Sequence, residues 1–150
     1  MSHRLALNRD GEWTWDGVEV THPGTRRFLF EHLVLDSVDG LLVRCGSDQT
    51  RVEVEDTPFI IRSVHLPADE HTAERIGIVL QDGTEEFLNL RSLRIGPANA
   101  LYTRVQGGGR GGPFDARFSR AAYHMLAECI EETGDGRFML RFKGNAYLIG

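Results

Sequence analysis

A glycine-rich segment flanked by arginines is the feature of this sequence with the clearest chemistry. It reads Gln106-Gly-Gly-Gly-Arg-Gly-Gly-Pro113. Glycines allow successive backbone amides to converge on an anion, and the N-terminus of a following helix favours negative charge. Arginine binds phosphate or carboxylate through two parallel hydrogen bonds. We therefore predict an anion-binding site, and its candidate residues are Arg104, Arg110, Arg117 and Arg120.

The glycine-rich segment matches neither of the common phosphate-binding motifs. No Gly-Lys-Ser/Thr follows it, as a P-loop requires. The second strand and distal acid of a dinucleotide-binding fingerprint are not arranged around it. A connector without a ligand is the alternative interpretation. One Arg-Gly-Gly element is a weak indication of RNA binding, and the net charge of -5 argues against nucleic acid as a partner.

A second cluster combines histidines and carboxylates. Its members are His65, Asp69, Glu70, His71 and Glu74. Their spacing fits no known metal-ligand framework, and the His-Glu-x-x-His order of zinc proteases is absent. Solvated loop residues are one interpretation, and a hydrolase that uses this cluster is the rival hypothesis for the whole chain. We predict no bound metal and no cofactor.

The remaining reactive or aromatic residues have structural interpretations. No Gly-x-Ser-x-Gly elbow occurs. Cys45 falls in a strand-like run and Cys129 on an apolar helix face, so both are predicted to be buried thiols rather than a disulfide. Trp13 and Trp15 lie on one side of a predicted strand. They are interpreted either as a contact in the core or between the halves, or as an exposed aromatic platform for a ligand.

Charge is unevenly distributed along the chain. Residues 48–86 contain ten acidic residues and three arginines, whereas residues 91–120 contain six arginines and one aspartate. The two segments either neutralise each other in the fold or leave a local basic patch.

The first elements follow from alternation and turn residues. Residues 51–62 alternate apolar and charged side chains, break at Asp-Thr-Pro and resume as an apolar run, which predicts two strands joined as a hairpin. Asp16-Gly17 suits a type I′ turn between strands at 12–15 and 18–20. Thr21 is the expected cap of a helix that begins near Pro23 and ends about Leu33.

The later elements repeat this pattern of hairpins and one helix. We expect an Asp-Gly hairpin over residues 75–90, strands at 92–95 and 100–105, and an open loop at 106–113. Apolar residues at helical spacing from Phe118 to Ile130 predict the second helix, and strands at 138–142 and 147–149 end the chain.

Short connections exclude a doubly wound parallel sheet, which needs a crossover helix between successive strands. The predicted class is α+β, with mostly antiparallel strands in two small roll-like halves that carry one helix each. The division is placed at residues 1–66 and 67–150, with the halves packed as one compact unit.

Several of these segments resemble an uncharacterised bacterial family, the domain of unknown function twelve-eighty-five. The residues that carry the resemblance are Gly11-Glu-Trp13, Asp16-Gly17, Asp39-Gly40, Val52-Glu-Val-Glu-Asp-Thr-Pro-Phe59, Leu101, Arg104 and Ser119-Arg-Ala-Ala-Tyr123. The resemblance implies two small α+β, roll-like halves. It implies no activity, because the family has no established catalytic residues.

We expect from the sequence a small, non-enzymatic binding or interaction module. Its partner would be an anionic small molecule or a protein, and a homodimer joined through the oppositely charged segments is a further possibility. No window approaches the ~18 consecutive apolar residues of a membrane span. The N-terminal residues lack the apolar core of a secretory signal, so the expected location is the cytoplasm.

Overall fold

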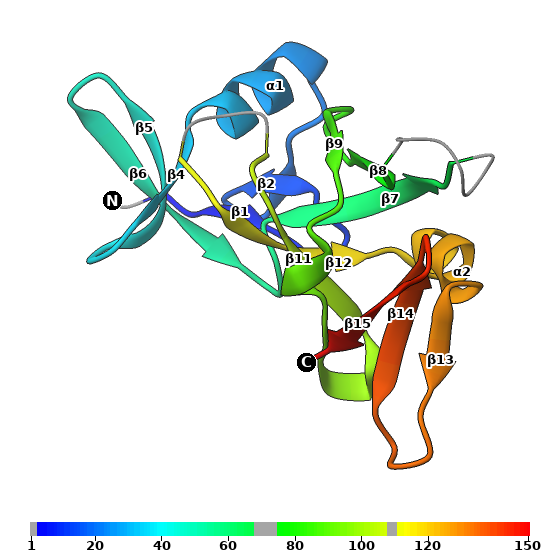
Figure 1. Cartoon of the computed structure of the whole chain (residues 1–150). Coiled ribbons are helices and arrows are strands. Elements are labelled where there is room, and N and C mark those ends of the chain that lie inside the picture. Colours follow the sequence, from blue (N-terminus) through cyan, green and yellow to red (C-terminus); the bar gives the residue numbers. More distant parts are fainter. Residues whose placement is uncertain (1–2, 68–74, 108–110) are drawn as a thin grey trace.

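The computed structural model describes residues 3–67, 75–107 and 111–150, and the chain forms three antiparallel-rich sheets with two helices (Figure 1). It therefore has the predicted α+β class, with one helix in each half. Among the described residues, neither helix has the length and apolar character needed to cross a membrane.

The first sheet has six strands. In order across the sheet they are β3 (Val18–Glu19), β2 (Trp13–Trp15), β1 (Leu5–Leu7), β6 (Asp48–Val54), β5 (Gly40–Cys45) and β4 (Leu33–Asp36). All neighbours are antiparallel except β1 and β6. The β2–β3 turn confirms the Asp-Gly prediction, because Asp16 and Gly17 both have positive φ angles, 49° and 84°.

Helix α1 (Pro23–Glu31) connects β3 to β4 and buries Leu29 and Phe30. It is shorter than predicted, because Leu33 is already the first residue of β4. The predicted cap was also wrong: His22, not Thr21, caps the helix, and its Nδ1 accepts the amide of Thr25 at 3.2 Å.

The second sheet also has six strands. In order they are β10 (Arg94–Ile95), β11 (Leu101–Val105), β12 (Phe114–Phe118), β7 (Phe59–His65), β8 (Gly77–Leu80) and β9 (Glu85–Phe87). Only β12 and β7 run parallel. Two short 3-10 turns, η1 (Leu90–Ser92) and η2 (Pro97–Asn99), flank β10.

The chain ends in a small layer beside this sheet, seen at the lower right of Figure 1. It consists of helix α2 (Arg120–Ala127) and a three-stranded sheet of β13 (Ile130–Glu132), β14 (Phe138–Phe142) and β15 (Asn145–Ile149). The predicted second helix was too long. Its apolar stripe is divided among β12, which contains Phe118, the helix, which buries Ala122 and Leu126, and β13, which contains Ile130.

The Asp-Thr-Pro corner joins the first two sheets, so the predicted hairpin was wrong. Strand β6 pairs with β5 and β1, whereas β7 pairs with β8 and β12. Inside the corner, the buried Thr57 hydroxyl donates to the carbonyl of Phe59 at 2.8 Å. The chain thus passes from the first sheet to the second at residues 55–58. The predicted division of the chain at residue 66 stays a prediction.

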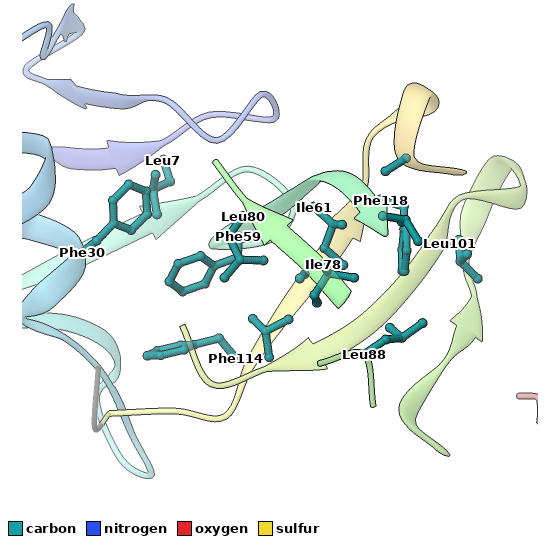
Figure 2. Close-up of a cluster of buried hydrophobic side chains, with 14 of the residues drawn as sticks. Leu7, Phe30, Phe59, Ile61, Ile78, Leu80, Leu88, Leu101, Phe114 and Phe118 are labelled. Atoms are coloured by element: carbon teal, nitrogen blue, oxygen red, sulfur yellow. The ribbon is translucent and has the colours of Figure 1, made fainter. Parts of the chain in front are cut away.

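One apolar core lies between the two large sheets (Figure 2). The Phe59 ring is fully buried, and its centroid lies 5.3 Å from the ring of Phe30 on α1 and 5.3 Å from the ring of Phe114 on β12. Phe59, the first residue after the corner, therefore packs helix α1 and strand β12 into the same core.

Candidate functional site

The outer face of β10, β11 and β12 brings together the arginines of the basic segment. Register places Arg94, Tyr102 and Arg117 side by side in one row, and Arg104 opposite Asp115 in the next row. Their chain neighbours Thr103, Val105, Phe114, Ala116 and Phe118 are buried on the other side of the sheet. We call these five residues, Arg94, Tyr102, Arg104, Asp115 and Arg117, the arginine face.

Tyr102 is the buried centre of the arginine face, only 5% exposed. Its ring lies against Gly96, where a Cβ atom would approach Cε2 to 2.5 Å, and the Arg94 guanidinium covers it with Cζ 4.5 Å from the centroid. The hydroxyl donates to the Asp56 carboxylate at 3.1 Å and 3.2 Å. Burial, together with this carboxylate, raises the pKa of Tyr102, so the phenol stays protonated at neutral pH and positions its neighbours.

Arg117 makes contacts within the protein and is mostly buried. Its Nε lies 3.2 Å from Oδ2 of Asp56, with only 18% of the arginine side chain exposed. Its terminal nitrogen donates to the carbonyl of Arg9 in the β1–β2 loop. Asp56, Tyr102 and Arg117 therefore join the corner, the second sheet and the N-terminal loop in one network.

Arg104 and Arg94 are the two cations of the arginine face that point into solvent. Arg104 is exposed and makes no ion pair with any residue that the structure describes. Arg94 lies 3.8 Å from Oδ1 of Asp115, and both side chains are about half exposed, so this ion pair is weak. The two guanidinium groups are accessible to an anion.

The glycine-rich loop does converge its amides on an anion, and that anion is internal. The amides of Gln106 and Gly107 donate to the two carboxylate oxygens of Glu86 on β9, at 2.9 Å and 3.0 Å. Glu86 thus fastens the loop at the end of β11 to the opposite edge of the same sheet. Arg110, a predicted site residue, lies outside the described residues.

The far end of this loop contacts the first sheet. The carbonyl of Gly111 accepts the amide of Leu35 in β4 at 3.0 Å. A Cβ atom at Gly111 would lie 2.4 Å from the Leu33 oxygen and 2.6 Å from Cα of Val34. The glycine is needed for this close approach of two backbones.

Arg120, the fourth predicted site residue, is exposed at the start of α2. It makes no ion pair with the described part of the chain. Ser119 caps the helix, and its hydroxyl accepts one of the first amides, that of Ala122, at 3.1 Å. Of the three predicted residues that the structure describes, Arg104 and Arg117 share one sheet face, and Arg94 joins them.

The carboxylates of the corner segment stabilise the fold. Glu53 pairs with Arg4 at 2.8 Å, and Glu55 accepts the amide of Arg9 at 2.7 Å. Arg51, at the alternate position before Glu53 on β6, lies 3.8 Å from Asp39. Sequence reasoning missed Asp56, Tyr102 and Glu86, and the only local signal was the position of Asp56 at the strand break.

The histidine–carboxylate cluster falls largely on residues whose structure is not described. His65 is exposed on β7, and Asp69, Glu70, His71 and Glu74 lie outside the described residues. Within the described ranges, no three His, Cys, Asp or Glu residues are grouped closely enough to hold a metal ion.

The cysteines differ from each other. Cys129 is partly buried, and desolvation raises the pKa of its thiol. Cys45 is exposed, so the prediction that it is buried was wrong. Both are free thiols. Trp13 is a core residue at 1% exposure, whereas Trp15 remains 41% exposed.

Comparison with known proteins identifies the fold. No protein-family model and no curated protein matches the sequence. A DUF1285 family protein from Shewanella baltica OS155 aligns with a TM-score of 0.67 at 19% identity, covering 84% of this chain and 91% of that one. A DUF1285 family protein from Silicibacter pomeroyi DSS-3 aligns with a TM-score of 0.74 at 19% identity, covering 97% and 78%. The predicted resemblance to the domain of unknown function twelve-eighty-five is therefore confirmed in the fold.

Proposed function

Starting from a fold shared with DUF1285 family proteins, we propose that this chain is a non-enzymatic binding module whose arginine face holds an anionic group. The observation that carries the proposal is the exposed Arg104, one row from Arg94 on a surface fixed by the Tyr102–Asp56–Arg117 network. The proposal is centred on the strands beside the glycine-rich loop, because Glu86 accepts the loop amides of Gln106 and Gly107.

The arginine face supplies both charge and rigidity. Guanidinium groups donate planar, paired hydrogen bonds that match phosphate and carboxylate. The Arg94 guanidinium lies over the Tyr102 ring, which limits the side-chain entropy lost on binding. The chain carries a net charge of -5, which disfavours anions over most of its surface. An anion would therefore bind at this local cationic face.

The ligand class that suits this surface is a phosphate or carboxylate, carried by a small molecule or an acidic protein segment. The face contains no histidine or cysteine, and the raised pKa of Tyr102 keeps its phenol protonated, so binding is favoured over acid–base chemistry. Hydrolysis by the His65 to Glu74 cluster, a cytoplasmic location and a homodimer stay predictions from the sequence.

Thermal unfolding at low salt with inorganic phosphate, citrate and a short poly-glutamate peptide tests this function. At 100 times its Kd, a ligand adds about 2.7 kcal/mol, which is a rise of several degrees in Tm for a chain of this length. Arg104→Ala and Arg94→Ala should each reduce the rise, and salt should weaken it.

Arg27→Ala is the matched control, because Arg27 is an exposed arginine on α1, outside the arginine face. It should leave the anion-dependent rise unchanged. If none of the three anions raises Tm, or if Arg27→Ala lowers the rise as much as Arg104→Ala does, the arginine face is not the site.

A further inference from the structure

A cavity of about 270 Å³ lies between helix α1 and the first sheet, apart from the arginine face. Apolar side chains from both elements form most of its wall. They are Leu5, Trp15, Val20, Phe28, Leu29 and Val43. A mainly apolar hollow between a helix and a sheet is a common form of small-ligand site, and this volume suits a ligand of about ten non-hydrogen atoms.

Two half-exposed aromatic rings line this cavity. Trp15 is 41% exposed and Phe28 is 43% exposed, although side chains of this size are usually covered. An imidazole covers one face of each ring: His3 stacks on Trp15 at 4.8 Å, and His32 stacks on Phe28 at 4.1 Å. The stacking restrains both rings, and each residue stays partly exposed beside the cavity.

The charge at the cavity is negative. Asp48, the first residue of β6, is the single residue with a full charge among those that line it. It is exposed and forms no ion pair within the described ranges of the chain. Thr25, in the first turn of α1, also lines the cavity. Its backbone amide donates to Nδ1 of His22 and so is not available to neutralise the Asp48 charge.

We propose that this cavity binds a small organic cation: an ammonium group on an apolar or aromatic body. The body would fill the apolar hollow, while the ammonium would lie near the Asp48 carboxylate and over an aromatic face. Cations are attracted to aromatic faces and to unpaired carboxylates, and an anion gains neither interaction here. The opposite charge preference separates this site from the arginine face.

Three probes with the same phenyl body test the charge preference: 2-phenylethylammonium, 2-phenylethanol and 3-phenylpropanoate. Binding is followed through the change in tryptophan fluorescence, which is expected from Trp15 because Trp15 lines the cavity and Trp13 does not, and is repeated by calorimetry. We expect saturable binding of the ammonium, binding of the alcohol weaker by a factor of about five, and no measurable binding of the carboxylate.

Variants then identify the residues. Asp48→Asn should lower the affinity for the ammonium to that for the alcohol and leave the alcohol unchanged. Phe28→Ala should weaken both by a factor of about ten. Asp10→Asn, at an exposed aspartate in the β1–β2 loop, is the control and should change neither.

Trp15→Phe checks that the optical signal comes from this cavity. The variant should lose the fluorescence change while calorimetry still detects binding of the ammonium. The proposal is overturned if the ammonium does not saturate, if the three probes bind equally, or if Asp10→Asn acts as Asp48→Asn does. These outcomes are independent of the anion experiment, because the residues varied in that experiment lie on β10, β11 and α1 outside this cavity.

Discussion

At the scale of single residues, two carboxylates join segments that are far apart in the sequence. Asp56 holds both Tyr102 and Arg117, and Glu86 holds the amides of Gln106 and Gly107. Glu86 accepts two backbone amides, whereas Asp56 accepts the Tyr102 hydroxyl and forms an ion pair with Arg117, so in both places a carboxylate charge fixes the geometry. Half-buried carboxylates with convergent donors therefore determine how the second sheet closes.

Glu86→Gln should destabilise the chain by about 1 to 3 kcal/mol. The amide keeps one acceptor oxygen, but its NH₂ group would face a backbone amide that also donates, so one of the two bonds is lost together with the charge. Urea unfolding followed by circular dichroism measures the change. Glu85→Gln, at the exposed neighbouring position, is the control and should stay within about 0.5 kcal/mol of the wild type. Equal effects of the two substitutions would contradict the role given to Glu86.

At the scale of elements, the sequence predicts what is encoded locally. The Asp-Gly turns, the strands beside them and the α+β class were confirmed, because turn residues and alternation act within a few positions. The partner of a strand depends on distant residues instead. Residues 51–62 therefore gave two correct strands and a wrong hairpin.

The missed strand β12 illustrates the same limit. Phe114, Ala116 and Phe118 alternate with Asp115 and Arg117, yet Phe118 also begins the apolar spacing of the following helix. Hydrogen bonding to β11 and β7 stabilises residues 114–118 as a strand rather than as the start of the helix. The local sequence pattern does not reveal either partner strand. The arginine face depends on this pairing, so the sequence could name Arg104 and Arg117 without placing Tyr102 opposite Arg117.

The contact between the glycine-rich loop and β4 gives a prediction at this scale. Gly111→Ala would place a methyl group within 2.6 Å of two β4 backbone atoms, so loop and strand must separate. We expect a loss of about 1 to 3 kcal/mol, measured by urea unfolding. Gly134→Ala is the matched control, since no atom lies within 4 Å of a Cβ there. If the Gly111 variant is as stable as the Gly134 variant, the loop does not depend on this contact.

At the scale of the whole molecule, the core and the sheet pairing join the two halves. Strand β7 precedes residue 66 but pairs with β8 and β12, which follow it. Leu7, Phe30, Phe59 and Phe114 belong to the same core cluster, as Figure 2 shows. The two proposed sites are thus carried on one core, the arginine face on the second sheet and the Asp48 cavity on the first.

A shared core predicts that the chain unfolds in one cooperative step. Trp13 and Trp15 both lie in the first sheet, so their fluorescence reports that sheet, while far-ultraviolet circular dichroism reports all three. The two urea transitions should coincide, with the same midpoint and slope. A fragment of residues 1–66 should lack a cooperative transition, because the partners of β7 and Phe114 of the shared core are missing. Separate transitions in the full chain, or cooperative unfolding of that fragment, would show that residues 1–66 and 67–150 fold as independent units.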